Sequence, residues 1–312
     1  MKALQFTTYG PPSVLTVADR PALEPRAGEV LVKVAAAGIN PGDVKNVAGH
    51  FDAKLPGVPG RDYAGVVVGG DAEKGMEVWG SGARRYGAHA EYVIVPAEWI
   101  SRKPPGLPME QAAAIGLPYI TAWSAVVTAG EIEEGETILI IGVSGAVGSA
   151  ATQIAHWKKA RVIGASKGSE NPARADELIV TSTHDLAAEV RRLTSGKGAD
   201  LVLDAVGGPM FEPALRSLRQ GGRQMVISSS EQRVTFDLVE FFENQSRLIG
   251  VDTGKLTGQD IAALMDVMST GFNEGHLHPP AITTWKLEDG AQAYEAVKQG
   301  RPRSKHVLIP AS

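Results

Sequence analysis

The sequence predicts an α/β fold in which a doubly wound parallel sheet is inserted into a discontinuous, mainly antiparallel β domain. Two observations lead to this prediction. Roughly the first hundred residues contain short β-rich runs separated by Gly and Pro clusters, a pattern typical of a twisted antiparallel barrel. From Thr137 onward, strand-like and helix-like segments alternate, as they do in parallel sheets whose strands are joined by helices.

The antiparallel domain is predicted from short apolar runs that end at turn-forming residues. Clusters such as Gly10 to Pro12 and Leu55 to Gly60 mark the breaks between them. The runs expected to form strands are Ala3 to Thr7, Val30 to Ala36, Tyr63 to Val68 and Glu91 to Val95. The charge-free stretch Gln111 to Gly130 follows, and it is interrupted by Gly116 and Pro118. We therefore interpret this stretch as buried helices at a domain junction rather than as a membrane span.

A glycine-rich turn dominates the next segment. Thr137 to Ile141 is predicted as a buried strand, Ala146 to Lys158 as a helix, and Arg161 to Ala165 as a second strand, which together make a βαβ unit. Glycines in the turn let the backbone approach a ligand, and the N-terminus of the following helix offers free N–H groups to a pyrophosphate. The spacing of glycines alone is a weak signal, so the βαβ context carries the prediction of a dinucleotide site. Its predicted contacts are Gly142, Ser144, Gly145, Ala146, Val147 and Gly148.

The end of the second strand indicates which cofactor is preferred. A site for NAD carries a carboxylate there to bind the ribose 2′-hydroxyl, but this chain has Ser166 and Lys167, and no carboxylate occurs before Glu170. We predict NADPH, with Ser166 and Lys167 binding the 2′-phosphate and Arg174 adding a second charge. The alternative is that Lys167 is a solvated loop lysine.

The remaining elements complete the parallel sheet. Helices are expected at Leu186 to Thr194 and Pro209 to Arg219, and strands at Leu201 to Asp204, Gln224 to Ile227 and Leu248 to Val251. Ligands of such sheets bind beyond the carboxyl ends of the strands. The residues predicted to contact the cofactor there are Val206, Gly207, Ser228, Ser229 and Val251.

The C-terminal segment is expected to return to the antiparallel domain. The predicted elements are a helix at Gly258 to Thr270, an extended run at Ala281 to Trp285, a helix at Leu287 to Gln299 and a strand at Lys305 to Ile309. The predicted domains are residues 1–122 with 256–312, which would bind the substrate, and residues 123–255, which would bind the dinucleotide.

Composition excludes several classes of function. The chain of 312 residues has no cysteine, which rules out a thiolate nucleophile, a cysteine zinc site and an iron–sulfur cluster, and which suits a reducing cytoplasm without requiring it. A net charge of −4 offers no broad attraction to nucleic acid or to a membrane. No apolar run follows Lys2, so no secretory signal is expected. The small basic groups are predicted to be solvated faces; they are Arg84 with Arg85, Arg191 with Arg192, and Arg301 to Lys305.

Taken together, these motifs resemble the medium-chain dehydrogenase/reductase superfamily, and specifically its zinc-free quinone oxidoreductase branch. The resemblance runs nearly from end to end. It implies a Rossmann-type domain inserted in a GroES-like domain, and a homodimer that could pair edge strands near Leu248 to Val251. The matching segments are Ala35 to Lys45, Leu55 to Val68, Tyr86 to Pro96, Ala112 to Trp123, the glycine turn, Ala199 to Gly208 and Lys305 to Pro310.

The resemblance also implies that no metal is bound. Asn40, Arg61 and Leu117 stand where zinc-dependent relatives have their catalytic ligands, and the loop that carries structural zinc is shortened to Gly80 to Gly87. A guanidinium in place of a donor would repel the ion. The segment Gly168 to Leu178 is shorter than in relatives of this branch, so the adenine side of the site is expected to be more open.

By the same resemblance, Asn40 and Thr121 should lie near the nicotinamide and the substrate, and Asp43 and Tyr63 near the pocket wall. Each has a structural alternative. Asn40 and Asp43 could form a turn, Tyr63 could belong to the barrel core, and Thr121 could bond to its own helix. Arg61 could donate hydrogen bonds to the substrate, or it could pair with Asp62 or Asp43.

We therefore predict a cytoplasmic, NADPH-dependent, zinc-free oxidoreductase. Without a Lewis acid, a hydride is best accepted by an electron-poor conjugated carbonyl such as a quinone, because conjugation delocalises the incoming charge. The alternative is a reductase of enone or enoyl-thioester C=C bonds, with Tyr63 as a proton donor. A third hypothesis is a NADPH-binding structural protein, crystallin-like, or a nucleic-acid-binding relative, in either case with little turnover.

Overall fold

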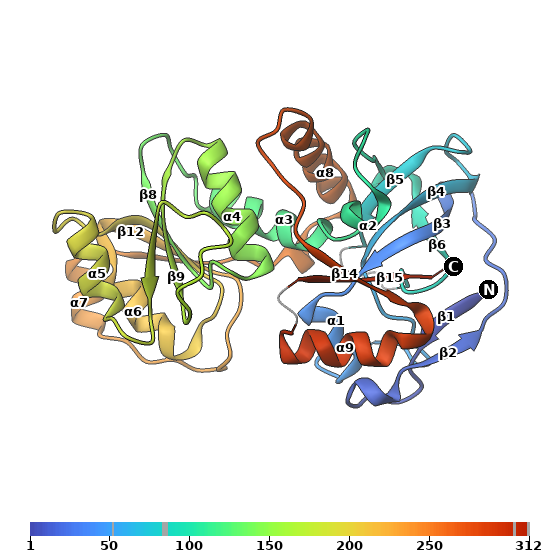
Figure 1. Ribbon diagram of the computed structural model, residues 1–312, viewed down its shortest axis with the longest axis horizontal. Coiled ribbons are helices and arrows are strands. Elements are labelled where there is room, and N and C mark those ends of the chain that lie inside the picture. The colour runs from blue at the N-terminus through green and yellow to red at the C-terminus, as the bar shows by residue number, and fades with distance from the viewer. Residues whose placement is uncertain (52, 83–86, 302–303, 311–312) are drawn as a thin grey trace. The chain divides into compact units, whose positions relative to one another are not determined.

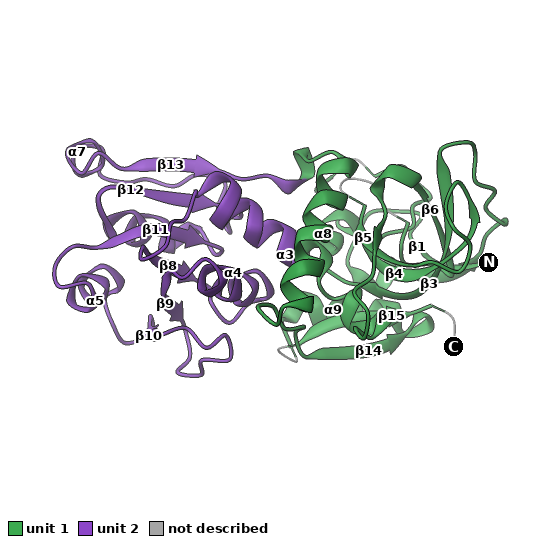
Figure 2. Ribbon diagram, turned by 90° about the horizontal axis from the view of Figure 1, so that it is seen from above, with its two compact units in different colours: residues 1–117, 254–312 green, residues 118–253 purple. Residues whose placement is uncertain are grey.

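The computed structural model describes residues 1–51, 53–82, 87–301 and 304–310, and the chain divides into two compact units (Figure 2). Unit 1 comprises Met1–Leu117 and Gly254–Ser312, and unit 2 comprises Pro118–Thr253. The domain boundaries predicted above stand at residues 122 and 255. Arg84, Arg85, part of the loop from Gly80 to Gly87, and part of the basic group Arg301 to Lys305 lie outside the described residues.

Unit 2 is built on a parallel sheet, which has six strands among the described residues, in the order β10-β9-β8-β11-β12-β13 (Figure 1). Every neighbouring pair of these strands is parallel. Numbered along the chain, this order is 3-2-1-4-5-6, the doubly wound arrangement of Rossmann-type domains, so the predicted fold is confirmed for this unit. The strands are β8 (Thr137–Ile141), β9 (Arg161–Ser166), β10 (Glu177–Val180), β11 (Ala199–Asp204), β12 (Leu218–Val226) and β13 (Arg247–Gly250).

Helices cover both faces of this sheet (Figure 1). The central strands are buried along nearly their whole length, because helices on both sides require apolar residues on both faces. The predicted helix Pro209 to Arg219 is shorter in the structure, since α6 ends at Arg216 and Leu218 already pairs with Ala199 as the first residue of β12. The helices are α4 (Ala146–Trp157), α5 (Leu186–Leu193), η4 (Gly208–Met210), α6 (Phe211–Arg216) and α7 (Leu238–Glu243).

The connection between β9 and β10 contains no helix among its described residues. Parallel neighbours are ordinarily joined by a crossover helix. Here the side chain of Asn171 accepts from the amide of Ala175 at 3.0 Å and donates to its carbonyl at 2.8 Å, which closes a tight turn. Ala173 and Ala175 are buried, and Ala175 packs over Gly164 in β9. Small side chains thus cover the part of the sheet that a helix would otherwise protect.

Unit 1 contains a mainly antiparallel sheet, which has seven strands among the described residues: six follow the order β14-β15-β3-β4-β5-β7, and the seventh, β6, pairs with β3. Its core joins Val30, Val32 and Val34 of β3 to Tyr63 and Val67 of β4. The strands are β3 (Glu29–Gly38), β4 (Asp62–Gly70), β5 (Glu77–Ser81), β6 (Tyr92–Pro96), β7 (Ser101–Arg102), β14 (Ile282–Lys286) and β15 (Lys305–Ile309), and a separate pair is formed by β1 (Lys2–Gln5) and β2 (Thr16–Asp19).

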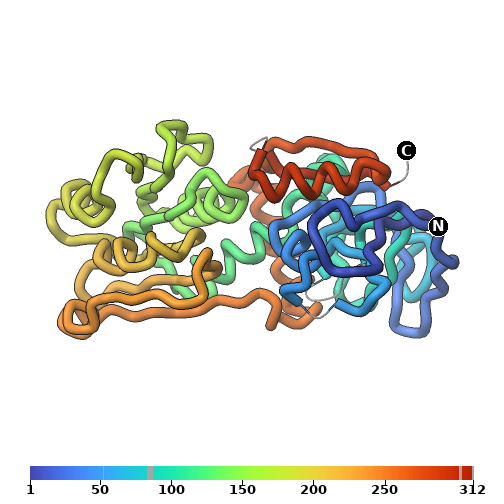
Figure 3. The backbone as a smooth tube through the Cα atoms, turned by 90° about the horizontal axis from the view of Figure 1, so that it is seen from below, coloured from blue at the N-terminus to red at the C-terminus, as the bar shows by residue number. Residues whose placement is uncertain are grey.

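The C-terminal segment completes unit 1. β15 pairs with β3, and β14 pairs in parallel with β15. α9 (Gly290–Gln299), drawn in red, runs beside the blue N-terminal segments (Figure 3), where Tyr294 shares a core with Leu4 and Phe6. The other helical elements are η1 (Pro12–Val14), α1 (Pro41–Val47), η2 (Ala97–Trp99), α2 (Met109–Ala112), η5 (Thr253–Lys255), α8 (Gly258–Asn273) and η6 (Leu287–Asp289).

The charge-free stretch from Gln111 to Gly130 is helical. It contains the end of α2, all of α3 (Gly116–Trp123) and a π-helical segment, η3 (Ser124–Ala129). Within the described ranges, no helix combines the length and the apolar character that a membrane crossing requires.

Candidate active site

The glycine turn lies at the carboxyl end of β8 and leads directly into α4. Gly142 has φ +79°, a left-handed conformation that glycine adopts without strain. Gly145 is the N-cap of α4, so the amides of Ala146, Val147 and Gly148 belong to the first turn, where the helix provides no acceptor. Gly145 and Ala146 are exposed. An anion could therefore reach these amides at the positive end of the helix dipole.

Gly148 packs the helix closely against the turn. A Cβ at this position would lie 2.7 Å from Cα of Val143 and closer still to the carbonyl oxygen of Gly142. Both contacts are to backbone, which cannot rotate away. Only glycine lets α4 begin this close to the end of β8.

Two hydroxyl groups join the ends of β8 and β9. Oγ of Ser144 lies 3.1 Å from Oγ of Ser166, and Ser166 also accepts from the amide of Gly168 at 3.3 Å. Lys167 is exposed, and within the described part of the chain its ammonium group forms no ion pair. The edge thus presents hydroxyl and ammonium groups, the chemical groups that a 2′-phosphate would bind.

Arg174 is the one predicted cofactor contact whose backbone lies away from this edge. It precedes Ala175, which packs over Gly164 in the middle of β9, and it adopts φ +57° in the turn closed by Asn171. Its side chain is exposed. Only the length of that side chain could bring the guanidinium to the carboxyl end of β9.

The switch point of the sheet lies between β8 and β11, where the strand order reverses. Oδ1 of Asp204 accepts hydrogen bonds from the amides of Val206 at 3.0 Å and Gly207 at 2.8 Å, which folds the chain sharply after β11. Val206 lies against the glycine turn, 3.1 Å from a Cβ placed on Gly142. Burial raises the pKa of Asp204, and these two amides oppose the shift. The turns after β8 and β11 therefore form one surface.

The loops after β11 and β12 also meet. Oγ of Ser229 accepts from the amide of Gly208 at 3.2 Å, and a Cβ on Gly207 would lie 2.6 Å from Cα of Ser229. Ser228 is exposed beside them, and Val251 follows β13, donating its amide to the carbonyl of Val226 at 2.9 Å. The structure thus places every predicted cofactor contact except Arg174 along one edge of the sheet.

This edge fits a dinucleotide. The free amides of a twelve-residue helix and a turn that only glycine can form match a pyrophosphate. The cation Lys167, which has no ion-pair partner in the described chain, matches an additional phosphate. The residues that would hold the pyrophosphate are those of the glycine turn, and Ser166 with Lys167 would lie at the adenosine ribose.

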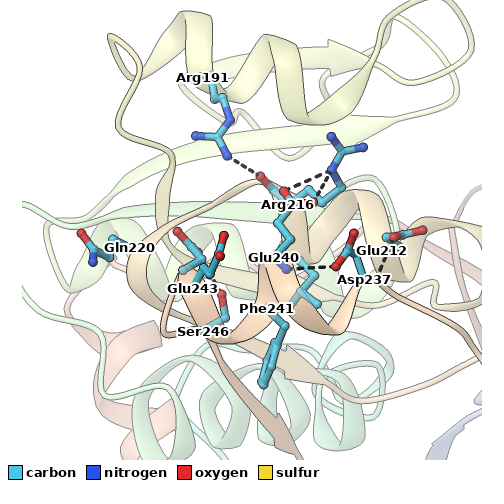
Figure 4. A pocket seen from close by; sticks show the side chains of 11 residues that line it. Arg191, Glu212, Arg216, Gln220, Asp237, Glu240, Phe241, Glu243 and Ser246 are labelled. Carbon is cyan, nitrogen blue, oxygen red and sulfur yellow. Dashed lines mark hydrogen bonds and ion pairs between the residues drawn. The ribbon is translucent and has the colours of Figure 1, made fainter.

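A pocket of about 310 Å³ lies elsewhere in unit 2, among α5, α6 and α7 (Figure 4). Its wall combines Arg191 and Arg216 with several carboxylates, and Arg216 pairs with Glu240 at 3.1 Å. Gln220 and Ser246, which also line it, lie near the amino ends of β12 and β13. It is therefore at the end of the sheet opposite to the glycine turn and does not belong to the cofactor edge.

In unit 1, a buried polar cluster gathers at the carboxyl end of β3. Asn40 is the N-cap of α1, and its Nδ2 donates to Oδ2 of Asp62 at 2.8 Å, while its Oδ1 accepts from Nζ of Lys305. Both oxygens of Asp62 accept from the amide of Leu117 at 3.1 Å. Asp62, Asn40 and Lys305 are exposed by 0, 1 and 6%. Burial lowers the pKa of Lys305, and the charges of Asp62 and Asp43 oppose the shift.

Asp43 and Arg61 extend this cluster. Oδ2 of Asp43 accepts from the amide of Asn40 at 2.8 Å, which stabilises the first turn of α1. Oδ1 of Asp43 lies 3.7 Å from Nε of Arg61. Arg61 therefore pairs with Asp43, one of the two partners weighed from the sequence. With Lys305 and Asp62, the cluster holds two positive and two negative side chains.

Tyr63 points away from this cluster. Successive side chains of a strand face opposite sides of the sheet, so Asp62 faces the polar cluster while Tyr63 enters the barrel core, where a Cβ on Gly80 would lie 3.0 Å from its hydroxyl. Burial raises the pKa of Tyr63 well above its ordinary value. This placement corresponds to the core alternative rather than to a proton donor.

His89 lies close to the polar cluster, but both of its ring nitrogens are used in structural hydrogen bonds. Its Nε2 lies 3.2 Å from the carbonyl of Gly38 and its Nδ1 lies 2.8 Å from the hydroxyl of Tyr294. Because a carbonyl only accepts, Nε2 carries the proton and Nδ1 accepts from Tyr294. Burial lowers the pKa of His89, so the ring is neutral.

Thr121 lies on α3 in unit 2 and is half-buried. Its hydroxyl makes no hydrogen bond within the described chain, so the alternative of a bond to its own helix is not observed. The hydroxyl remains available to a ligand.

The residues at the metal-ligand positions do not fit zinc. Asn40 offers an amide oxygen that already faces the ammonium group of Lys305, Leu117 offers no side-chain donor, and Arg61 is a cation. Across the described ranges, no group of three or more His, Cys, Asp or Glu side chains could hold a metal ion. The donor set is that of a charge-balanced hydrogen-bond network.

Two members of this network were missed from the sequence. The sequence suggests Asp62 only as a partner for Arg61. It predicts that Lys305 lies on a solvated basic face, and this prediction is wrong because the side chain is buried. The apolar run Val307 to Ile309 could have signalled burial of the whole short strand, because a continuous apolar run is typical of an inner strand.

Comparison with known proteins agrees with this architecture. Residues 26–105 match the alcohol dehydrogenase GroES-like domain, and residues 146–270 match the zinc-binding dehydrogenase domain. A zinc-type alcohol dehydrogenase-like protein of Schizosaccharomyces pombe is 33% identical over 88% of this chain and 86% of its own. A quinone oxidoreductase of Homo sapiens is 29% identical over 99% of this chain and 97% of its own.

A solved structure gives the same result. The quinone oxidoreductase of Pseudomonas syringae pv. Tomato DC3000 superposes with a TM-score of 0.91 and 27% identity, covering 99% of each chain. The predicted GroES-like and Rossmann-type domains are thus confirmed. The chain belongs to the medium-chain dehydrogenase/reductase superfamily, in its quinone oxidoreductase branch, and is an NAD(P)-dependent oxidoreductase.

Proposed function

We propose that this protein is an NADPH-dependent, zinc-independent reductase of quinones or similar conjugated carbonyl compounds. The observation that carries the proposal is the polar cluster of unit 1, in which Asn40, Arg61 and Leu117 take the metal-ligand positions but offer no zinc site. An acceptor for such an enzyme must be electron-poor before it binds, because no metal polarises its carbonyl. Quinones meet this requirement and simple ketones do not.

Different residues of the chain would bind the cofactor and orient the acceptor. The glycine turn would fix the pyrophosphate, and the loops after β11, β12 and β13 would line the ribose and the nicotinamide. When bound, reduced nicotinamide supplies a hydride. Asn40 and Thr121 would orient the acceptor, and hydrogen-bond donors near its oxygen would stabilise the charge that develops there. A proton from solvent would complete the hydroquinone.

Preference for NADPH is supported by the end of β9. The hydroxyl of Ser166 and the ammonium group of Lys167 favour a 2′-phosphate, and no carboxylate stands there to bind a free 2′-hydroxyl. The test is kcat/KM for NADPH and NADH in the wild type and in Lys167→Ala. Arg174→Ala tests the second charge, and Lys197→Ala is the matched control, because Lys197 is an exposed lysine just before the amino end of β11, at the opposite end of the sheet. An unchanged preference in Lys167→Ala would rule out the assignment.

The activity itself is tested by an acceptor screen in which NADPH oxidation is monitored. The panel should contain benzoquinones, naphthoquinones, enones and simple ketones, each with and without EDTA. We expect turnover with quinones that EDTA does not change. Turnover restricted to simple ketones, or lost with the chelator, would contradict the proposal, and no turnover with any acceptor would favour a NADPH-binding structural protein.

Reduction of an activated C=C bond is the second candidate, and it needs a proton donor beside the alkene. Tyr63, which the sequence offered for that role, lies in the barrel core with a raised pKa. This placement lowers the rank of the candidate. Product analysis separates the two reactions, because a saturated ketone and a hydroquinone differ in mass and in absorbance.

We also propose that the protein forms a homodimer through β13 and works in the cytoplasm. β13 is an edge strand, and three exposed apolar side chains of α7 accompany Leu248 near it; they are Leu238, Val239 and Phe242. A second copy that pairs edge strands would cover these side chains and complete the ladder. Sedimentation velocity of Phe242→Glu against the wild type tests the dimer, and a variant of unchanged mass would exclude this surface.

A further inference from the structure

The side chain of Asn40 is held between two charged groups of opposite sign. Its Oδ1 accepts a hydrogen bond from Nζ of Lys305, and its Nδ2 donates to Oδ2 of Asp62 at 2.8 Å. All three residues are buried, and Nζ of Lys305 lies 4.0 Å from Oδ2 of Asp62. The amide thus spans a buried ion pair.

These two charges select one orientation of the amide. An ammonium group only donates, and a carboxylate only accepts. If the amide were rotated by half a turn, its N–H groups would face Lys305 and its oxygen would face Asp62, so both contacts would become repulsive. Charge-assisted hydrogen bonds are also stronger than neutral ones, and burial keeps water from competing.

Asp62 is itself held in place. Both of its oxygens accept from the amide of Leu117 at 3.1 Å, and a Cβ on Gly116 would lie 2.7 Å from its Oδ1. The carboxylate is therefore enclosed by the first residues of α3. A fixed carboxylate transmits its position to the amide of Asn40.

One donor of the amide is left over. Nδ2 carries two hydrogens, and only the bond to Asp62 uses one of them among the described residues. The oxygen of the amide already faces Lys305. A substrate atom that contacts the side chain of Asn40 would therefore face an N–H donor rather than a carbonyl acceptor.

Building on the proposed function, in which Asn40 lies beside the acceptor, we propose that Lys305, together with Asp62, is a positioning residue that presents Asn40 to the substrate oxygen as a hydrogen-bond donor. The hydride carries two electrons to the quinone, which becomes a hydroquinone monoanion and then takes a proton from solvent, while the nicotinamide is left oxidised. Negative charge develops on the quinone oxygen during this transfer, and an N–H donor stabilises it whereas an amide oxygen would repel it.

The test compares three variants of the full chain. Lys305→Met removes the group that fixes the amide oxygen, Lys305→Arg keeps a charged donor, and Lys305→Met combined with Asp62→Asn removes both charges, so that no buried carboxylate is left unpaired. For each, we would measure kcat and KM with a series of quinones of graded reduction potential, the Kd of NADPH, and the Tm.

We expect kcat of Lys305→Met to fall about ten- to a hundredfold with the Kd of NADPH changed by less than about twofold, because only the donor to the substrate is disturbed. The dependence of log kcat on reduction potential should become steeper, since the quinone must then stabilise more of the charge itself. Lys305→Arg should recover most of the rate. The double variant should regain the Tm of the wild type but not its kcat.

Several results would overturn this assignment. If the double variant regains both Tm and kcat, Lys305 serves stability alone. An equal dependence on reduction potential in Lys305→Met and the wild type would also exclude a role for the donor in charge stabilisation. A wild type that binds NADPH but reduces no quinone would instead refute the proposed function, and with it the substrate-facing role of Asn40.

Discussion

Replacing Gly148 by alanine should damage the cofactor edge more than any other single methyl group in the glycine turn. The new Cβ would lie 2.7 Å from Cα of Val143, whereas ordinary contacts begin at 3.4 Å, so α4 must move by about 0.7 Å or more away from β8. The neighbouring atoms belong to the backbone and cannot rotate aside. The first turn of the helix, which carries the free amides of Ala146 and Val147, would move with it.

The cost can be estimated from two opposing effects. Forcing a methyl group into a packed site costs up to about 3 kcal/mol, and alanine regains about 1 kcal/mol through its higher helix propensity, which leaves a net loss of roughly 2 kcal/mol. Displacing the phosphate-binding amides by most of an ångström should raise the Kd of NADPH by at least about tenfold. The Tm should fall by roughly 4–8 °C.

The assays are titration of NADPH by its fluorescence and thermal unfolding followed by circular dichroism. Ser149→Ala is the control, because Ser149 is the next residue of the same helix, is half-buried and has no role in the turn. It should leave both quantities unchanged. If Gly148→Ala binds NADPH as tightly as the wild type does, the close approach of α4 to β8 does not form the phosphate site.

Three further predictions concern buried titratable groups. Arg223→Met should lower the free energy of unfolding by about 3–5 kcal/mol in urea titrations, because Glu136 loses the partner that binds both its oxygens, at 2.9 and 2.6 Å. Arg102→Met is the control: it breaks the exposed pair with Glu73 and should cost less than about 1 kcal/mol. The lowered pKa of His89 means that, below its ordinary value of 6.5, the unfolded chain gains a proton that the folded chain refuses; stability should therefore fall as the pH drops below 6.5, and His89→Gln should flatten that fall. The pKa of Asp204 is raised, so above pH 3.8 the folded state keeps a proton that the unfolded state loses. The free energy of unfolding of the wild type should therefore decline relative to that of Asp204→Asn as the pH rises. If the two free energies change with pH in parallel, burial imposes no such penalty.

Much of unit 2 could be predicted because its signals are local. The strand, the glycine turn and the helix from Thr137 onward are read from residue types that determine backbone conformation within a few positions of themselves. The strand Lys305 to Ile309 was predicted with the bounds that the structure has. The sequence does not decide which face of β4 carries Tyr63 into the core. A strand with apolar residues on both faces does not reveal which face is turned inward.

The connection between β9 and β10 also shows where prediction from local sequence ends. The sequence from Gly168 onward shows that this connection is short, but nothing local indicates that Ala175 would pack over Gly164 and place the backbone of Arg174 beside the middle of β9. That outcome follows from the sheet, which must be covered by whatever residues the short connection provides.

The sequence by itself determined the order of the elements, the glycine turn, the absence of thiolates and the family, since each follows from residue identity and short spacing. Only the tertiary structure decided that Asn40, Asp62 and Lys305 form one buried network, because Lys305 and Asn40 stand 265 positions apart and meet only through the pairing of β15 with β3. A contact across that separation has no local signature. Its energy appears only when the strands bring an ammonium group, an amide and a carboxylate together out of reach of water.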